Sequence, residues 1–423
     1  MFVFYDYLSN EVRLIVGLYN YGLELHYCIS YYKLMIQRTA EDTIRNLAKG
    51  FKAITITGPR QSGKTTLARS IFDSYTYVSL EDLDSRQFAQ DDPRGFLKQY
   101  GPHTIIDEVQ RVPDILSYLQ SKLDDSKETA QYILTGSQNF LLSQHIGQTL
   151  VGRTSLTTLL PLTLEEISRF HQKRIANVND AILTGSYPGV YDQKIDPGIF
   201  YSSYVSLYLE RDVRDLRTID NLPKFQRFIT LCAGRAGQIL NMTALSNAVG
   251  VDVKTIDAWL GVLEASFIAY RLQPYAANVS KRLVKMPKLY FYDTGMLCYL
   301  LGIRNTQELT ISHFYGNILE NLAVGELMKT QTNAGQQPRI YFIRDQYAEA
   351  DCVFETEEGL AIAEVKATST YASEHSVKLK SFAELLNIPT KRHYLIYTGE
   401  TQTRSDIKLV NICDIQSEIT QQS

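Results

Sequence analysis

The sequence predicts an α/β protein built in three parts: a parallel β-sheet domain, a helical middle segment that contains a winged helix, and a carboxy-terminal α/β domain. A glycine-rich loop joins an apolar strand to a helix near residue 58. Two short helices with helix-turn-helix spacing follow residue 240, and two apolar runs flank a polar turn near residue 357. At 423 residues, the chain has room for about three domains of ordinary size.

The composition restricts the class of protein. Its hydrophobic share of 44% and charged share of 21% are typical of a globular, water-soluble chain. A net charge of −3 provides no overall attraction to nucleic acid or anionic membranes, so any DNA contact must come from local patches. The five cysteines form no C-x-x-C pair, which predicts a reduced, cytoplasmic protein without a structural zinc. No apolar run reaches the length of about eighteen residues that a membrane span needs.

Residues 1–34 differ from the rest of the chain. They contain seven tyrosines in no clean period, and they lack the basic start and apolar core of a secretory signal. We expect Met35 to be the true start and the preceding segment to be a start-site artefact. The alternative is a short aromatic docking tail.

The amino-terminal domain, residues 35–175, contains a complete G-x-x-x-x-G-K-[ST] phosphate-binding loop. An apolar strand at 53–57 precedes it and a helical run at 66–72 follows, which is the context that this pattern requires. Glycines let the backbone wrap a phosphate at a helix N-terminus, whereas a glycine-rich turn outside this context binds nothing. We expect a nucleotide to contact Gly58, Pro59, Arg60, Gln61, Ser62, Gly63, Lys64, Thr65 and Thr66.

Specific roles follow from the chemistry of these side chains. Lys64 reaches the β- and γ-phosphates, and the Thr65 hydroxyl ligates Mg²⁺. A second predicted strand, at 103–106, ends in Asp107 and Glu108. Asp107 holds Mg²⁺ through water, and Glu108 polarises the attacking water as general base, which favours hydrolysis over transfer to a small-molecule acceptor. ATP and Mg²⁺ are therefore the predicted ligands.

Three further residues are candidates in this domain. Thr135 and Ser137 follow another apolar strand, and either can sense the γ-phosphate; the sequence does not choose between them. Arg153 can stabilise transition-state charge as an arginine finger, in cis or across the boundary of a homo-oligomer. Equally, it can be a surface arginine that closes a helix end.

Five strings of the chain resemble a large family of poorly characterised prokaryotic AAA-type ATPases. The strings are GPRQSGKTT, IIDEVQ, LTGSQ, VGR and LPLTLEEI, and they occur in this order within residues 58–167. The resemblance extends from about Met35 nearly to the C-terminus. It implies a P-loop sheet flanked by helices, with ATP hydrolysis. In such proteins the carboxy-terminal half is a domain of unknown function related to restriction endonucleases.

The middle of the chain reads as helical. Residues 176–221 form a predicted linker, whose string at 208–213 also resembles the family. Residues 222–292 predict a winged helix-turn-helix, with helices at 240–250 and 253–267. Its predicted wing carries Lys281, Arg282, Lys285 and Lys288. The second helix offers only Lys254 as a base-facing cation, so DNA contact and packing between domains are equally open.

The carboxy-terminal domain, residues 293–423, contains a predicted β-hairpin. If residues 356–359 form its loop, Glu355 pairs with Leu360, and Asp351 then lies opposite Glu364. Two opposed carboxylates repel each other, and a divalent metal between them would explain the arrangement. Lys366 lies on the same face as Glu364 and would orient or help deprotonate a metal-bound water.

This D…E-x-K hairpin resembles the PD-(D/E)xK nuclease core. That core commonly adds an acidic residue from an upstream helix, a position that Glu320 matches, and continues into a helix and strand, here 375–386 and 393–398. Two hypotheses follow. In the first, a Mg²⁺-dependent ATPase is coupled to a nuclease-like, DNA-interacting domain. In the second, ATP controls a regulatory switch whose carboxy-terminal fold is a non-catalytic module that binds a protein partner.

Overall fold

The structure is a computed structural model that describes residues 13–21, 24–32, 36–137, 149–207, 219, 221–276 and 286–419. The chain divides into two compact units, residues 1–37 and residues 38–423. In the first unit, β1 (Arg13–Tyr21) pairs antiparallel with β2 (Glu24–Tyr32), although the tyrosine-rich sequence shows no strand period. The start at Met35 stays a prediction.

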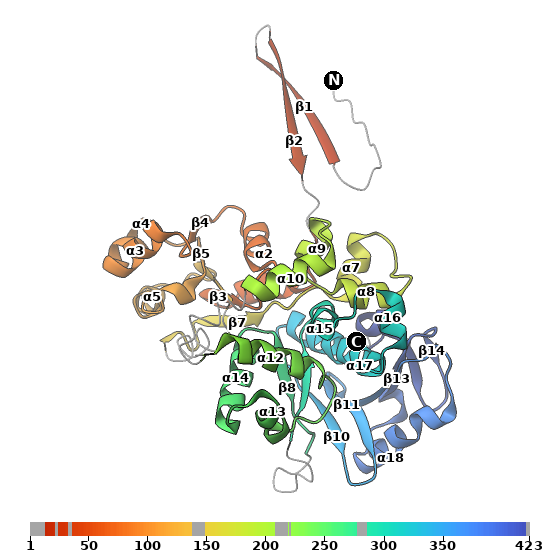
Figure 1. The fold of residues 1–423 in the computed structure, drawn as a ribbon. Helices are drawn as coiled ribbons and strands as arrows, with labels where there is room; N and C mark the ends of the chain where they lie inside the picture. Colours follow the sequence, from red (N-terminus) through yellow and green to blue (C-terminus); the bar gives the residue numbers. More distant parts are fainter. Residues whose placement is uncertain are drawn as a thin grey trace. The chain divides into compact units, whose positions relative to one another are not determined.

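The second unit opens with a five-stranded parallel sheet of order β4-β5-β6-β3-β7 (Figure 1). Its strands are β3 (Ala53–Thr57), β4 (Thr76–Ser79), β5 (Thr104–Asp107), β6 (Tyr132–Gly136) and β7 (Thr154–Thr158). Every residue of β3, β5 and β6 is buried, because helices cover both faces of a parallel sheet. The carboxyl ends of these strands therefore meet at one edge, where the predicted nucleotide residues follow them.

Helices on the two faces of this sheet form separate cores. The helices are α1 (Ala40–Ala48), α2 (Lys64–Ile71), α3 (Leu83–Asp91), α4 (Pro93–Gln99) and α5 (Ile115–Asp124). Ile44 and Leu67 pack with Ile54 in one core, while Phe96 and Leu116 belong to the other. The sheet is thus a rigid platform for the loop between β3 and α2.

Short helices connect this domain to the middle segment. They are α7 (Leu164–Phe170), α8 (Val178–Thr184), α9 (Pro188–Asp192), α10 (Pro197–Leu207), α12 (Leu222–Ala233), α13 (Met242–Val249) and α14 (Val253–Ala265). Asparagine or aspartate caps begin α12, α13 and α14, with Asn221, Asn241 and Asp252 each accepting a backbone N–H. The predicted pair of short helices is therefore present as α13 and α14.

An antiparallel pair, β8 (Ala269–Leu272) with β9 (Lys288–Phe291), follows α14 where the wing is predicted. The wing residues Lys281, Arg282 and Lys285, and the string at 208–213, lie outside the described residues. Lys288 is described and is 2% exposed. Of the two alternatives for the wing, DNA contact and packing between domains, Lys288 takes the second, because its ammonium is buried against carboxylates of the carboxy-terminal domain.

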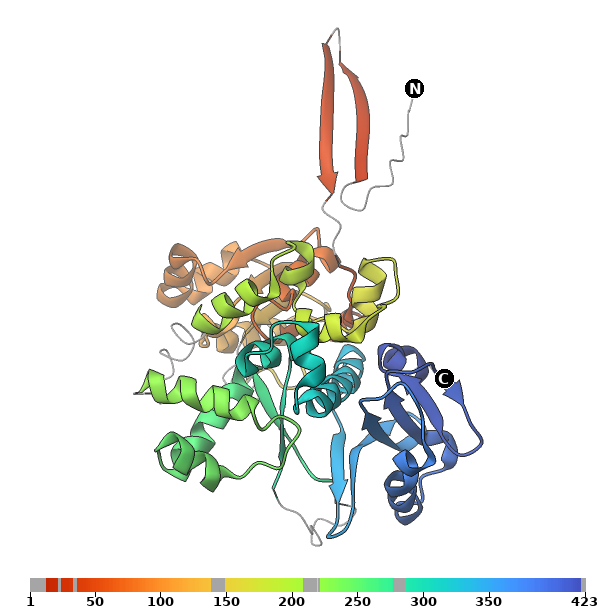
Figure 2. The ribbon, with the colours of Figure 1, turned by 45° about the vertical axis from the view of Figure 1, so that its right-hand side comes forward.

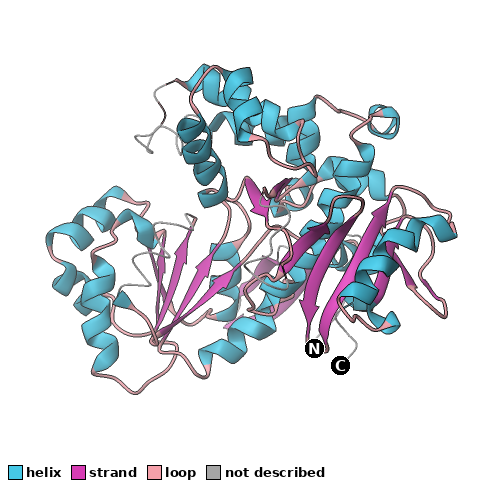
Figure 3. Cartoon of the chain, turned by 90° about the horizontal axis from the view of Figure 1, so that it is seen from below, coloured by secondary structure: helices cyan, strands magenta, loops and turns pink. Residues whose placement is uncertain are grey.

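The carboxy-terminal domain contains a mixed six-stranded sheet of order β10-β11-β12-β13-β15-β14, drawn in blue in Figure 2. Its strands are β10 (Ile340–Arg344), β11 (Glu349–Thr356), β12 (Gly359–Lys366), β13 (His393–Tyr397), β14 (Gln402–Thr403) and β15 (Lys408–Asn411). The helices of this part are α15 (Thr294–Leu301), α16 (Thr306–Ile311), α17 (Tyr315–Asn333), α18 (Val377–Leu385) and α19 (Ile415–Ile419). Figure 3 shows both sheets with helices against them.

Helix α17 contacts elements of all three parts. It packs against β7 and α1 of the first sheet domain, β9 of the middle segment, and β10 and β12 of the carboxy-terminal sheet. Its residues from Ile318 to Asn333 are buried, with a single half-buried exception at Glu320. A helix buried on all sides holds its neighbours in place, so α17 fixes how the carboxy-terminal sheet meets the first.

Candidate functional site

The loop between β3 and α2 has the backbone that its glycines predict. Gly58 has φ 145°, and a Cβ there would lie 2.1 Å from the Leu159 carbonyl oxygen. Gly63, the residue before α2, has φ 91° in the left-handed region. Helix α2 then begins at Lys64, so its first N–H groups point into the loop. The Ser62 hydroxyl in this cradle is fully buried and has no hydrogen-bond partner among the described residues.

Lys64 lies inside the loop and is 5% exposed. Its Nζ donates to the carbonyl oxygens of Gly58, at 3.0 Å, and Pro59, at 2.7 Å. Burial lowers the pKa of Lys64 to about 8, although the charges of Glu108 and Asp107 oppose the change. The ammonium is therefore enclosed by the backbone of the loop.

Asp107 is the centre of a hydrogen-bond cluster at the end of β5. The Thr65 hydroxyl donates to its two carboxylate oxygens, at 3.0 and 3.1 Å, and the Thr135 hydroxyl donates to Oδ1. Tyr77 donates to Oδ2 at 2.8 Å. These contacts follow from strand order, because β5 lies between β4, which carries Tyr77, and β6, which carries Thr135. The Thr65–Asp107 pair is the oxygen set that Mg²⁺ prefers beside a triphosphate.

Glu108 follows directly in a left-handed conformation, with φ 55°. Such a conformation is costly for a residue with a Cβ. Ser137 donates to Glu108 Oε2 at 3.1 Å, and the Gln110 amide donates to the same oxygen and to Ser137. Thr135 and Ser137, between which the sequence does not choose, thus contact different carboxylates.

A cavity of about 520 Å³ opens beside the loop. Its loop side is formed by Gln61, Gly63, Lys64, Thr65, Thr66 and Glu108. Helices α9 and α10 form the other side, with Pro188, Phe200 and Tyr204 among the lining residues. Pro59, Arg60 and Ser62 belong to the loop without lining this cavity. The volume lies within the range of about 300–1,000 Å³ that small-molecule sites occupy.

Arg153 lies at the amino-terminal ends of the strands, opposite the carboxyl ends that the loop follows. Its carbonyl accepts the N–H of Ala53, the first residue of β3, whereas the loop follows the last residue of that strand. Its guanidinium pairs with Asp124, with Nη2 and Oδ2 2.9 Å apart. The prediction of an arginine finger in cis is therefore wrong, because the length of β3 separates the two. Action across a subunit boundary stays a prediction.

The predicted hairpin of the carboxy-terminal domain is present in the predicted register. Glu355 pairs with Leu360, and the pairs Thr356–Gly359 and Cys352–Ala363 fix the same alignment. Continued by one residue, this register sets Asp351 opposite Glu364. The tight two-residue turn differs from the predicted four-residue loop because Thr356 and Gly359 are themselves paired.

Lysines, not only carboxylates, occupy this cluster. Lys288 Nζ lies 2.9 Å from Glu320 Oε1 and 2.6 Å from Glu349 Oε1, and Lys366 Nζ lies 2.5 Å from Glu364 Oε1. Asp351 accepts the Val365 N–H at 2.8 Å. Within the described ranges, no three histidine, cysteine, aspartate or glutamate side chains form a metal-binding group.

Burial dominates the protonation of these acids. It raises the pKa of Glu320 to about 8 and that of Glu364 to about 7, with the charge of Asp351 adding to both. Burial also raises the pKa of Asp351. The second oxygen of Glu364 is buried, and no described residue donates to it. The structure thus brings the predicted metal residues together, but two of them are ion-paired with lysine.

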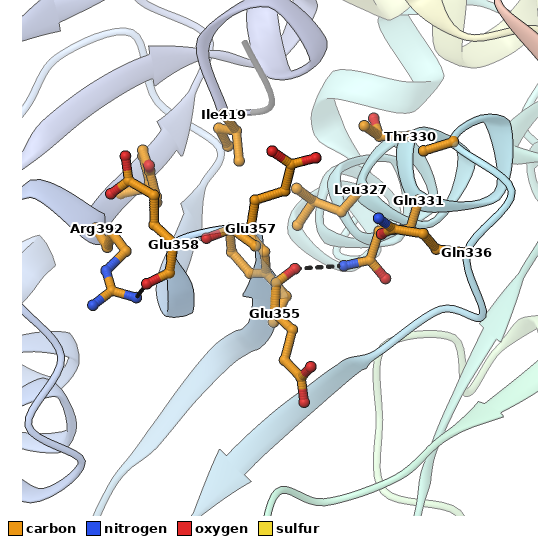
Figure 4. A pocket seen from close by; sticks show the side chains of 13 residues that line it. Leu327, Thr330, Gln331, Gln336, Glu355, Glu357, Glu358, Arg392 and Ile419 are labelled. Atoms are coloured by element: carbon orange, nitrogen blue, oxygen red, sulfur yellow. Dashed lines mark hydrogen bonds between the residues drawn. The ribbon is translucent and has the colours of Figure 1, made fainter. Parts of the chain in front are cut away.

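A smaller cavity of about 130 Å³ lies between α17 and the turn of the β11–β12 hairpin (Figure 4). The Gln331 amide donates to the Glu355 carbonyl at 2.8 Å, and Arg392 donates to the Glu358 carbonyl at 2.7 Å. None of the sequence-predicted site residues lines it.

The sequence does not predict three residues that lie near the loop. Tyr77 and Arg38 belong to no sequence motif. Tyr77 contacts Asp107 because their strands are neighbours in the sheet, and Arg38 contacts Ser62, which lies 24 positions later in the chain. Glu166 has a local signal, because Thr163 and Glu166 form the T-x-x-E capping box that begins α7. That signal predicts a helix start and not a contact with Arg38.

Comparison with known sequence families supports the assignment of the first domain. Residues 50–168 match the family described as "AAA domain". Residues 175–307 and 315–415 match two domains of unknown function, DUF8612 and DUF4143. Together with the loop and the parallel sheet, the first match makes the amino-terminal part an AAA-type P-loop domain with a nucleotide site.

Two similar proteins carry the description "uncharacterized protein". An uncharacterised protein of Mycobacterium tuberculosis is 27% identical over 372 residues, which cover 87% of this chain and 81% of that protein. An uncharacterised protein of Methanocaldococcus jannaschii is 25% identical over 314 residues, which cover 66% of this chain and 67% of that one.

Among solved structures, the Walker-type ATPase PABY2304 of Pyrococcus abyssi matches with a TM-score of 0.42 and 12% identity, covering 62% of this chain and 94% of that chain. The Thermotoga maritima RuvB Holliday junction branch migration motor matches with a TM-score of 0.31 and 16% identity, covering 55% and 88%. No helix in the described part of this chain is both long enough and apolar enough to span a bilayer.

Proposed function

We propose that this chain is a Mg²⁺-dependent ATP hydrolase. The observation that carries the proposal is the Thr65–Asp107 contact of 3.0 Å beside the buried Lys64. Thr65 and Asp107 would hold Mg²⁺, which neutralises phosphate charge when bound. Lys64 and the N–H groups at the start of α2 bind the phosphates.

Glu108 is the proposed general base. It lines the cavity, and Ser137 and Gln110 hold its carboxylate on one oxygen, which leaves the other to accept a proton from water. The Thr135 hydroxyl donates to Asp107 and the Ser137 hydroxyl donates to Glu108, so either residue would sense the γ-phosphate through the carboxylate that it contacts. This arrangement favours hydrolysis over transfer to a second substrate.

The test is phosphate release by the full chain with Mg²⁺ and ATP. Lys64→Ala is expected to lose nucleotide binding, while Glu108→Gln binds ATP and loses about 10²- to 10⁴-fold in kcat. Glu128→Gln, an exposed acid of the same domain, is the matched control. If Glu108→Gln hydrolysed ATP at the wild-type rate, Glu108 would not be the general base. If the wild type bound no ATP, the proposed function would be wrong.

For the carboxy-terminal domain, we infer the second of the two hypotheses, a nucleotide-controlled module that binds a partner protein. The observation that favours it is Lys288, whose buried ammonium already pairs with Glu320 and with Glu349. A carboxylate bound to an internal ammonium is a poorer ligand for a divalent cation. The unpartnered oxygen of Glu364 is the feature that supports the metal-dependent nuclease.

The two hypotheses separate in one assay. The protein is incubated with plasmid or single-stranded DNA and Mg²⁺ or Mn²⁺, with and without ATP, beside Glu364→Ala. We expect no cleavage while ATP is hydrolysed. Cleavage that Glu364→Ala abolishes would establish a nuclease at Asp351, Glu364 and Lys366, with DNA as substrate, and would overturn the module.

A further inference from the structure

A buried arginine, Arg38, donates a hydrogen bond to the backbone of the phosphate-binding loop. Arg38 precedes α1 and is 5% exposed. Its Nη1 donates to the Ser62 carbonyl at 2.7 Å, and its Nη2 donates to the Leu160 carbonyl at 2.6 Å. One planar guanidinium therefore joins the loop to the chain that follows β7. Movement of the loop must move Arg38 or break one of these bonds.

Glu166 holds Arg38 in this position. The carboxylate is fully buried, and its Oε1 lies 3.2 Å from Arg38 Nε. It also accepts the N–H of Thr39 at 2.6 Å and the N–H of Thr163 at 2.9 Å. Glu166 thus connects the arginine to the first turn of α7, where it completes the capping box.

The same turn of α7 is bonded to α17. The N–H of Leu164 donates to Glu326 Oε2 at 2.9 Å, and the other oxygen of Glu326 accepts Lys329 Nζ at 2.9 Å. Lys329 also donates to the Leu162 carbonyl at 2.7 Å and to Ser186 Oγ at 3.0 Å. All of these side chains are buried.

This series of contacts reaches the nucleotide cavity at one end and the carboxy-terminal sheet at the other. Ser186 lies two residues before Pro188, which lines the nucleotide cavity. At the other end, α17 carries Glu320 of the carboxylate cluster and Gln331, which bonds the β11 backbone at Glu355. A single helix therefore extends from the nucleotide domain to the carboxy-terminal sheet.

We propose that Arg38 is a positioning residue for the phosphate-binding loop, and that Glu166, Glu326 and Lys329 transmit the state of the loop to α17. Nucleotide at the loop then stabilises the docking of α17 and so regulates the carboxy-terminal domain. The inference rests on the proposed ATP site. A purely structural network would stabilise the fold equally with and without nucleotide.

The role of Arg38 is tested by Arg38→Lys, which keeps the charge near Glu166 but replaces the planar fork, whose two terminal nitrogens each reach one carbonyl, with a single nitrogen. We expect KM for ATP to rise about tenfold, with kcat of the folded protein changed less, because a displaced loop binds phosphate poorly. An unchanged KM together with a lower melting temperature would overturn the positioning role.

Transmission is tested by hydrogen–deuterium exchange over residues 315–333, with and without Mg²⁺ and a non-hydrolysable ATP analogue. In the wild type we expect exchange to slow about tenfold on binding. Glu326→Gln should remove this response while ATP still binds. Glu355→Gln, whose ion pair with Arg339 is exposed, should respond as the wild type does.

Failure of the relay and failure of the ATP site give different results. A wild type that hydrolyses ATP but shows equal exchange in α17 with and without the analogue overturns the relay alone. A wild type that binds no nucleotide overturns both. If Glu326→Gln does not fold, Glu326→Leu with Lys329→Met removes both buried charges at similar volume. A response retained in that double variant would also overturn the relay.

Discussion

At the scale of single residues, the site depends on the side chains that donate hydrogen bonds to Asp107. Its carboxylate accepts three hydroxyls, from Thr65, Tyr77 and Thr135, and these hydrogen bonds fix its orientation. Glu108, one residue later, has a left-handed conformation and its own partners. The two adjacent acids therefore have different hydrogen-bond partners.

Tyr77 provides the first test at this scale. Tyr77→Phe removes the hydroxyl that donates to Asp107 Oδ2 at 2.8 Å but keeps the ring, over which Arg69 lies at 4.8 Å. A hydrogen bond to a charged group contributes about 1.5–3 kcal/mol, and part of this remains through Thr65, so we expect kcat/KM to fall about three- to tenfold. Steady-state ATPase kinetics measure this, with the exposed Tyr118→Phe as control. Equal rates in the two variants would show that Tyr77 does not position Asp107.

Lys64 gives a pH dependence. Its pKa in the nucleotide-free protein is about 8, below its ordinary 10.5, because it is buried. Phosphate binds the charged form, so the Kd for ATP should be constant below pH 8 and rise up to about tenfold per pH unit above it. Titration calorimetry between pH 7 and 9.5 measures this. In Lys64→Met, binding should be weaker at every pH and nearly flat; a flat wild-type curve would contradict the lowered pKa.

At the scale of elements, β9 and α17 are joined by buried charge. Lys288 on β9 pairs with Glu320 on α17 and with Glu349 on β11, so one ammonium connects three elements. The sequence predicts Lys288 in a basic wing. The alternation of side chains along a strand does not show which face of that strand another element covers. The helix that covers it lies almost thirty positions later in the chain.

Removal of this ammonium has a predictable cost. Lys288→Met leaves Glu320 without its cation in a buried site, whereas Glu349 keeps Arg344 Nη1 at 3.3 Å, and this should lower the free energy of unfolding by about 3–5 kcal/mol. Arg339→Met removes an exposed ion pair with Glu355 and should lower the free energy of unfolding far less. Urea denaturation at pH 7 compares them. If the two variants lose equal stability, Lys288 is not the partner on which the cluster depends.

At the scale of the whole molecule, residues 38–423 form one compact unit although they match three separate families. The reason is α17, whose buried length contacts the sheets at both ends of the chain. Contacts of this kind make domains unfold together.

The single tryptophan tests this cooperativity. Trp259 lies in α14 of the middle segment and is 2% exposed, so its fluorescence reports on a part that does not line the nucleotide cavity. If the parts unfold together, Mg²⁺-ATP at about 100 times its Kd should stabilise the fluorescence transition by about 2.7 kcal/mol. Lys64→Met should abolish the shift. A nucleotide-independent Trp259 transition in the wild type would mean that the middle segment unfolds separately.

The sequence by itself determined the features whose residues are neighbours in the chain. The phosphate loop at 58–66, the acids at 107 and 108 and the register of the β11–β12 hairpin are local, because each depends on backbone geometry over a few residues. Tertiary structure alone decided the partners. Arg38 contacts a carbonyl 122 positions away, Leu164 bonds Glu326 across 162 positions, and Arg153 lies at the wrong edge for a finger in cis. Periodicity shows that a side chain is buried, but only the packing of distant elements determines which charge is buried beside it.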